Sequence, residues 1–187
     1  VHPTLLGDTA GGMDEGRWTW VSSDGRWVAF TSDAPNLIPG QVDEQRGDYS
    51  YWNTDVFLRD RQTGATTLVS HTSASFTTTA NGVSIAMGIS SDGRYVLFGS
   101  DATDLVAGQT DSNADLDIFL YDSLDASIQL VSHSSAGPTT AGNAPSPAAV
   151  LSADGAFVAL TSQSTDLVAG QIDANNADDV FLFERAT

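Results

Sequence analysis

The sequence repeats itself three times, and this periodicity constrains the fold more than any other feature of the chain. Residues 21–32 return as residues 89–100 and again as residues 151–162. The Asp-Val-Phe-Leu block that begins at Asp55 returns at Asp117 and Asp179, after 62 residues on each step (55 to 117 and 117 to 179). The chain is therefore expected to consist of three copies of one structural unit.

Each repeat has the pattern of several short β-strands. An Asp-Gly pair stands between two runs of β-branched and aromatic residues, which predicts a hairpin with a type I′ turn. First strands are expected near residues 18–21, 86–89 and 148–151, second strands near 27–31, 95–99 and 157–161, third strands near 55–59, 117–121 and 179–183, and fourth strands near 66–71 and 128–133. No stretch of ten or more residues has helical periodicity, so little helix is expected.

Four antiparallel strands at a period of about 60 residues are typical of a β-propeller blade. The predicted fold is all-β, a single unit over residues 1–187 with three four-stranded blades: blade 1 at about 16–72, blade 2 at about 84–134, and blade 3 at about 146–185 with an outer strand from residues 3–9.

The hairpin motif resembles the TolB-like propeller repeats of bacterial envelope and secreted proteins. Their hallmark, Ser-x-Asp-Gly-(Arg/Lys)-x-(Ile/Val)-(Ala/Val)-Phe, is matched at residues 22–30 and 90–98, and at 152–160 except for Ala156 and Leu160. The family's following Asp-(Ile/Val)-(Phe/Tyr) strand is matched at Asp55, Asp117 and Asp179. The resemblance implies a platform for protein contacts or ligand binding, usually without catalysis and sometimes within peptidases or transport assemblies.

The amino-acid composition excludes several classes of partner and of functional site. A formal charge of −17 disfavours nucleic acid and anionic lipid, because binding to either depends on Lys and Arg. Apolar runs of four or five residues are too short to span a membrane. The absence of cysteine excludes disulfides, thiolate zinc sites and thiol nucleophiles. The absence of lysine together with abundant Ser, Thr, Asn, Asp and Gly indicates a bacterial extracellular or cell-surface protein, with the periplasm as the alternative.

Catalytic sequence motifs are absent, so the chain is not expected to be an enzyme. His71 and His133 stand at equivalent positions of two repeats. This repetition favours a structural hydrogen-bonding role for both side chains.

Two acidic segments are candidates for a calcium site. Carboxylates and amides alternate at Asp111, Asn113, Asp115 and Asp117, and the third repeat keeps Asp173, Asn175 and Asp179. Oxygen ligands at alternate positions of a tight loop suit Ca²⁺, which takes about six to eight of them. The alternative is that Asp and Asn are simply favourable turn residues.

The first repeat carries an insertion of six residues, since 68 residues separate its Asp-Gly turn from the next one (24 to 92), against 62 for the following step (92 to 154). The insertion places aromatic and charged residues in a polar loop, which makes them candidates for binding carbohydrate or protein: Arg46, Asp48, Tyr49, Tyr51 and Trp52. Arg46-Gly47-Asp48 also spells an adhesion tripeptide, a match expected often by chance. The alternative is that the aromatics fold back over the strands of the first repeat.

The repeats are out of phase with the ends of the sequence. The fourth-strand block at residues 67–72 is matched near the N-terminus by Thr4, Leu5, Leu6, Gly7 and Asp8, whereas residues 179–185 form a third strand with no fourth strand after it. The N-terminal strand is therefore expected to complete the last blade. Three blades are too few for a closed ring. The sequence thus predicts exchange of this strand between copies, giving a six-bladed homodimer, with a strand-linked polymer or a slice of a longer array as alternatives. Other surface proteins and glycans are the alternative partners.

Overall fold

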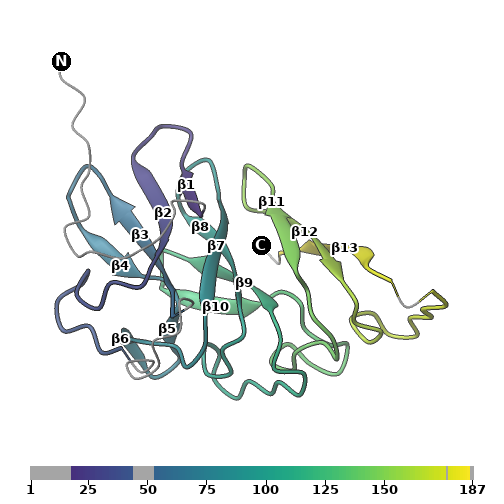
Figure 1. Ribbon diagram of the computed structural model, residues 1–187. Helices are drawn as coiled ribbons and strands as arrows, with labels where there is room; N and C mark the ends of the chain where they lie inside the picture. The colour runs from purple at the N-terminus through teal and green to yellow at the C-terminus, as the bar shows by residue number, and fades with distance from the viewer. Residues whose placement is uncertain (1–17, 44–52, 176, 186–187) are drawn as a thin grey trace.

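The computed structural model describes residues 18–43, 53–175 and 177–185 (Figure 1). All the regular structure in these residues is β, in thirteen strands, which confirms the predicted all-β class. The strands form three antiparallel sheets, one for each repeat, and a separate two-stranded hairpin. None of the described segments is a helix that is long and apolar enough to cross a membrane.

The three sheets have the strand order expected for propeller blades. Blade 1 contains β1 (Thr19–Val21), β2 (Trp27–Ser32), β3 (Asp55–Asp60) and β4 (Thr66–Leu68) in that spatial order. Blade 2 repeats it with β7 (Ser84–Ile89), β8 (Tyr95–Ser100), β9 (Asp117–Asp122) and β10 (Ser127–Leu130). Blade 3 has β11 (Ala148–Leu151), β12 (Phe157–Ser162) and β13 (Asp179–Glu184). The first, second and third strands thus lie within two residues of their expected positions.

The fourth strands are shorter than expected, and the prediction for residues 66–71 and 128–133 is wrong in its second half. The strand β4 ends at Leu68 because the N–H groups of both Val69 and Ser70 point at the Val56 carbonyl, at 2.8 and 3.3 Å. This doubling breaks the ladder as a bulge does. After the break, β5 (His71–Thr72) pairs with β6 (Ser75–Thr79) in a hairpin that the polar sequence did not indicate.

The turn of each blade is also not of type I′, which would need a positive φ at both central residues. In the first turn Gly25 has φ of 70°, whereas Asp24 does not lie in the left-handed region. The Gly25 N–H donates to the Ser22 carbonyl (2.9 Å) and the Trp27 N–H donates to Ser22 Oγ (2.9 Å). The connection is therefore a longer loop that contains a β-turn and places glycine at its left-handed position.

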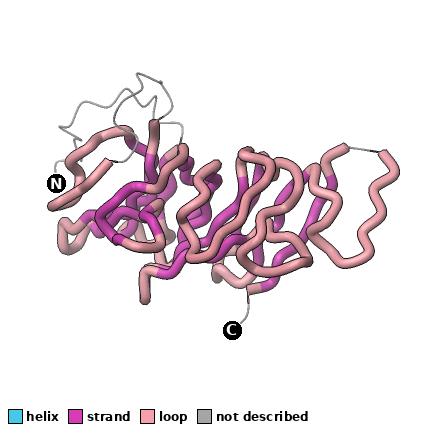
Figure 2. The backbone as a smooth tube through the Cα atoms, turned by 90° about the horizontal axis from the view of Figure 1, so that it is seen from below, coloured by secondary structure: helices cyan, strands magenta, loops and turns pink. Residues whose placement is uncertain are grey.

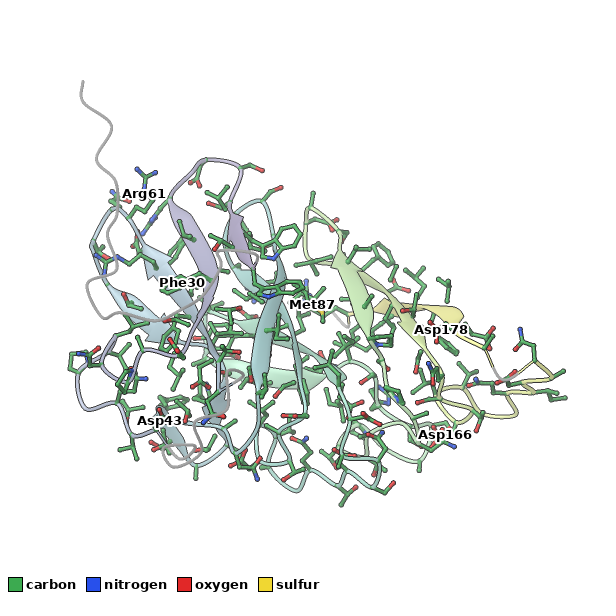
Figure 3. All side chains as sticks on the ribbon, viewed as in Figure 1. Phe30, Asp43, Arg61, Met87, Asp166 and Asp178 are labelled. Carbon is green, nitrogen blue, oxygen red and sulfur yellow. The ribbon has the colours of Figure 1, made fainter. Side chains whose placement is uncertain are left out.

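The hydrophobic core lies between neighbouring blades. In Figure 2 the sheets stand beside one another along the molecule, and the middle sheet, blade 2, contributes residues to a core on each of its faces. The core between blades 1 and 2 contains Ala29, Val56, Leu58, Val96, Phe98, Phe119 and Tyr121. The core between blades 2 and 3 contains Tyr95, Leu97, Ile118, Leu120, Val158 and Leu160, with Met87 (labelled in Figure 3) packed against it. A blade of this chain is therefore stabilised mainly by its neighbours.

Candidate interaction surface

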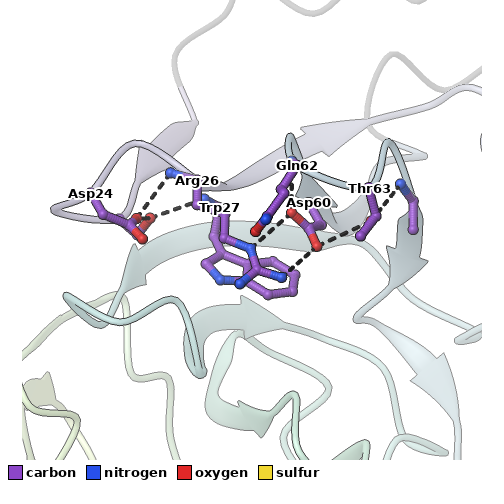
Figure 4. A network of polar contacts seen from close by, with 8 residues as sticks. Asp24, Arg26, Trp27, Asp60, Gln62 and Thr63 are labelled. Atoms are coloured by element: carbon purple, nitrogen blue, oxygen red, sulfur yellow. Dashed lines mark hydrogen bonds and ion pairs between the residues drawn. The ribbon is translucent and has the colours of Figure 1, made fainter.

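The Asp-Gly turn is held by a polar network within its own blade (Figure 4). Ser22 Oγ donates to Asp24 (2.6 Å), and Arg26 donates to both carboxylate oxygens of Asp60 (3.0 and 2.8 Å). The Ser22 hydrogen bond lowers the pKa of Asp24, and the Arg26 hydrogen bonds lower the pKa of Asp60 well below its usual range. The Arg26 guanidinium also lies 4.8 Å from the centre of the Trp27 ring. The motif residues are therefore engaged in holding the turn.

Blade 2 repeats this network, with Arg94 bound to Asp122 at 2.9 and 2.7 Å. The third repeat has Ala156 in place of the arginine, so its turn lacks this ion pair. The Ser-Asp contact persists there, at 2.6 Å between Ser152 and Asp154.

The second repeated block of the sequence is held by its glutamine. Gln109 Nε2 donates to the Ala102 carbonyl (2.7 Å), and Gln109 Oε1 accepts a hydrogen bond from the Val106 N–H (3.1 Å). Gln41 and Gln171 make the equivalent contacts in blades 1 and 3. This block fixes the path of a loop, and its repetition has a structural cause.

The turns also join each blade to the next one. The Ser23 N–H donates to the Ser91 carbonyl (3.0 Å), and the Ser91 N–H donates to the Ala153 carbonyl (2.7 Å). Gly93 lies so close to the Trp27 ring that a Cβ atom there would overlap it, and Gly155 lies in the same way against the ring of Tyr95. The turn of one blade thus covers the aromatic residue of the blade before it.

Two aspartates at the start of third strands are buried. Asp55 accepts a hydrogen bond from Ser70 Oγ (2.8 Å), and Asp117 accepts one from Ser132 Oγ (2.7 Å). Burial raises the pKa of Asp55 to about 8 and that of Asp117 to about 7. Each serine hydroxyl also accepts the N–H of the residue after the aspartate, at 3.0 Å. These pairs explain the break in the fourth strands, and their only sequence signal is the recurrence of Ser at one repeat position.

Two of the proposed calcium residues of blade 2, Asp111 and Asn113, accept hydrogen bonds from the backbone of their own loop. Asp111 Oδ1 accepts the N–H groups of Asn113 (2.9 Å) and Ala114 (3.2 Å), and Asn113 Oδ1 accepts the Asp115 N–H (2.7 Å). Asp117 faces Ser132 at the start of β9. The loop has the local hydrogen bonds of Asx turns, as the alternative interpretation expected.

The acidic segment of blade 3 makes similar local contacts. Asp173 Oδ1 accepts the Asn175 N–H (2.9 Å), and Asn175 Oδ1 accepts the Ala177 N–H (3.2 Å), while Asp179 opens β13. Across the described residues, no three His, Asp or Glu side chains are grouped so that they could hold a metal ion. Calcium binding by either segment stays a prediction.

The two histidines make structural contacts. Nδ1 of His71 lies 2.9 Å from the Thr72 carbonyl, and Nδ1 of His133 lies 3.0 Å from the Ser134 carbonyl. His71 also reaches blade 2, where its Nε2 is 3.2 Å from the Ala126 carbonyl.

Two predicted sites fall outside the described residues. One is the aromatic loop with Arg46, Asp48, Tyr49, Tyr51 and Trp52, and the other is the N-terminal strand Thr4, Leu5, Leu6, Gly7 and Asp8. Both stay predictions, as do the blade limits that depend on residues 3–9 and 16–17.

The outer face of blade 3 is the feature that sequence reasoning missed. Its Val180 and Leu182 are 77% and 70% exposed. The equivalent pairs are buried against the next blade, at 0% and 2% for Val56 and Leu58 in blade 1 and at 0% and 3% for Ile118 and Leu120 in blade 2. Phe157 on the neighbouring strand is 39% exposed, against 3% for its equivalent Tyr95. We call Val150, Phe157, Val180 and Leu182 the blade 3 face. Its residues are apolar, like those of the core, but no strand or loop among the described residues packs over them.

The edge beside this face is also unpaired. In blades 1 and 2 a fourth strand pairs with the third, whereas in the part of the chain that the structure describes no strand pairs with the outer edge of β13. A free strand edge exposes backbone N–H and C=O groups that can pair with another chain. Blade 3 therefore offers an apolar face and a strand edge together.

No family model and no curated protein matches the sequence. Among solved structures, TolB from Acinetobacter baumannii is similar over 91% of this chain and 30% of its own, with 17% identity and a TM-score of 0.44. A structure assigned to TolB from Agrobacterium tumefaciens is similar over 90% of this chain and 45% of its own, with 16% identity and a TM-score of 0.46. The tricorn protease is similar over 82% of this chain and 11% of its own, with 16% identity and a TM-score of 0.48.

Two of these structures carry the name of the family that the repeats resemble. The chain spans less than half of the length of each of them. The blades described above are identified from the chain's own sheets.

Proposed function

We propose that the chain is a non-catalytic propeller module that acts by protein contact, with the blade 3 face and the free edge of β13 as its contact surface. The exposure of Val180 and Leu182 carries the proposal, because the same two positions are fully covered in both other blades. Apolar residues clustered on one face typically mark an interaction site.

The proposed partner is a second copy of the chain. Residues 4–8 match the fourth-strand block, and the place of a fourth strand beside β13 is vacant among the described residues. If the N-terminal strand of one copy pairs with β13 of the other, two copies complete two third blades and form a six-bladed assembly. Placement outside the cytoplasm is part of the proposal and is supported by composition alone.

The test is the solution mass measured by light scattering. We expect about 39 kDa, twice the monomer mass of 19.6 kDa. Leu182→Ser should shift the protein to the monomer mass. The matched control is Leu124→Ser, because Leu124 is 75% exposed but lies in the turn between β9 and β10, away from the blade 3 face.

Deletion of residues 1–9 should also prevent formation of the dimer and give monomers or aggregates. A full-length chain that remains monomeric at tens of micromolar would contradict self-association. A dimer that is unchanged by Leu182→Ser would show that the blade 3 face is not its interface.

A further inference from the structure

We infer that the blade 3 face docks on blade 1 of the second copy in the register already used between neighbouring blades, with Phe157 under Gly25 and the Ala153 N–H on the Ser23 carbonyl. This inference rests on the proposed function and names the partner surface and its orientation. Each junction joins two different blades, blade 3 of one copy and blade 1 of the other, and two such junctions related by a two-fold axis make up the whole interface.

The register is observed twice inside the chain. At the turns, a backbone N–H of one blade donates to a carbonyl of the next, from Ser23 to Ser91 and from Ser91 to Ala153. Away from the turns, the Ser73 N–H donates to the Asp104 carbonyl, and the Ser135 N–H donates to the Asp166 carbonyl, both at 2.8 Å. Blades 1 and 2 are thus joined by the same two hydrogen bonds as blades 2 and 3, which defines a single register between neighbouring blades.

Blade 3 presents the donor half of this junction. Among the described residues no group accepts a hydrogen bond from the Ala153 N–H. Phe157 holds the position of Trp27 and Tyr95, whose rings lie under Gly93 and Gly155, but no glycine turn in the described part of the chain covers it. An Asp-Gly turn from another blade could therefore cover the Phe157 ring in the same way.

Blade 1 presents the acceptor half. The Ser23 carbonyl accepts no hydrogen bond from the described part of the chain, although its equivalents at Ser91 and Ala153 both do. Of the described residues, only Arg61 lies near the space that a Cβ atom on Gly25 would enter, with its guanidinium at 3.6 Å, whereas the same space at Gly93 is filled by an aromatic ring. Val21 is exposed, whereas its equivalents Ile89 and Leu151 pack into the cores between blades.

The donor surface on blade 3 and the acceptor surface on blade 1 are compatible with a closed, two-fold symmetric dimer. If blade 3 of each copy docks on blade 1 of the other, the contact occurs twice about a two-fold axis and leaves neither half unused. A single head-to-tail contact that did not close would instead propagate into a fibre. Six blades lie within the range of four to eight that is usual for propellers, which favours closure.

Cross-linking between single-cysteine variants tests the register, because the natural chain has no cysteine. Ser23→Cys and Ala153→Cys are made as separate proteins, mixed, and treated with a short bifunctional maleimide. We expect a covalent dimer whose joined peptides contain positions 23 and 153, and no such product from either variant alone. The double variant Ser91→Cys with Ala153→Cys sets the expected yield, since these two residues are hydrogen-bonded across blades within one chain.

Substitutions at Phe157 provide an independent measurement. Phe157→Asp should raise the dissociation constant of the dimer at least tenfold, because it places a charge under the turn of the partner. Phe157→Trp should leave the constant within about threefold, because Trp27 already fills the equivalent place.

The outcomes separate this inference from the proposed function. A dimer with cross-links between two copies of position 153, or with none at position 23, would overturn the register while leaving self-association standing. A protein that stays monomeric would remove both. Equal dissociation constants for the wild type and Phe157→Asp would also overturn the register.

Discussion

The exposure of the blade 3 face predicts opposite effects for one substitution at two equivalent positions. Leu120 and Leu182 occupy the same place in β9 and β13, but Leu120 is 3% exposed and Leu182 is 70% exposed. Leu120→Ala removes a fully packed side chain from the core between blades 2 and 3, which costs about 2–5 kcal/mol in comparable cores. Leu182→Ala removes a side chain that is less than one third buried, so we expect a loss below about 1 kcal/mol in the monomer.

Thermal unfolding, followed by circular dichroism at concentrations where light scattering gives the monomer mass, measures both losses. For a chain of this size, about 3 kcal/mol corresponds to a fall in Tm of about 6–12 °C, and 1 kcal/mol to about 2–4 °C. At concentrations where the dimer forms, the loss for Leu182→Ala should grow, because the partner then covers the side chain. If Leu182→Ala costs as much as Leu120→Ala in the monomer, the face is already covered within the chain and the reasoning is wrong.

Three further predictions concern the buried carboxyls, the turn glycines and the net charge. The raised pKa values of Asp117, about 7, and Asp55, about 8, mean that the folded state binds protons more tightly than the unfolded state. The stabilisation from these two groups is therefore complete below about pH 4 and is lost as the pH rises to 7–8. Between the unfolded and the folded pKa of one group, the free energy of unfolding falls by about 1.4 kcal/mol per pH unit for that group. Asp117→Asn should flatten the fall in Tm between pH 5 and 8, and an unchanged slope would contradict this assignment. Gly93→Ala should destabilise the monomer by several times the roughly 1 kcal/mol expected for Gly25→Ala, because both glycines have positive φ but only Gly93 meets the Trp27 ring; equal losses in urea unfolding would argue against that contact. Raising NaCl from 0.05 to 0.5 M should tighten the dimer, since two copies of charge −17 repel each other and salt screens them; sedimentation equilibrium showing weaker association would refute this.

Local sequence predicted the strands well where a repeat combines alternating apolar residues with a glycine turn. It failed where side chains interrupt the ladder. The fourth strands were expected to continue to His71 and His133, but Ser70 and Ser132 turn inward to bind the buried carboxyls of Asp55 and Asp117. A serine in a strand gives no sign of such a contact, because its partner is 15 residues away along the chain.

Asp117 illustrates the same limit for the candidate site. Its spacing from Asp111, Asn113 and Asp115 suits a metal loop, and one sequence cannot distinguish that loop from a turn. In the tertiary structure Asp117 accepts a hydrogen bond from Ser132, which follows β10. The sequence pattern does not show this partner, because Ser132 lies 15 residues away along the chain.

The number of repeats, the positions of the first three strands in each repeat and the glycine of each turn can be predicted from the sequence alone, because they depend on local patterns and on glycine at the left-handed positions. Which apolar residues form core and which form surface depends instead on how the blades pack. Val180 and Leu182 are of the same type as Val56 and Leu58, and all four stand in equivalent strands. One pair is buried and the other exposed because, among the described residues, a neighbouring blade packs against β3 but none packs against the outer face of β13, and the strand itself does not encode its neighbour.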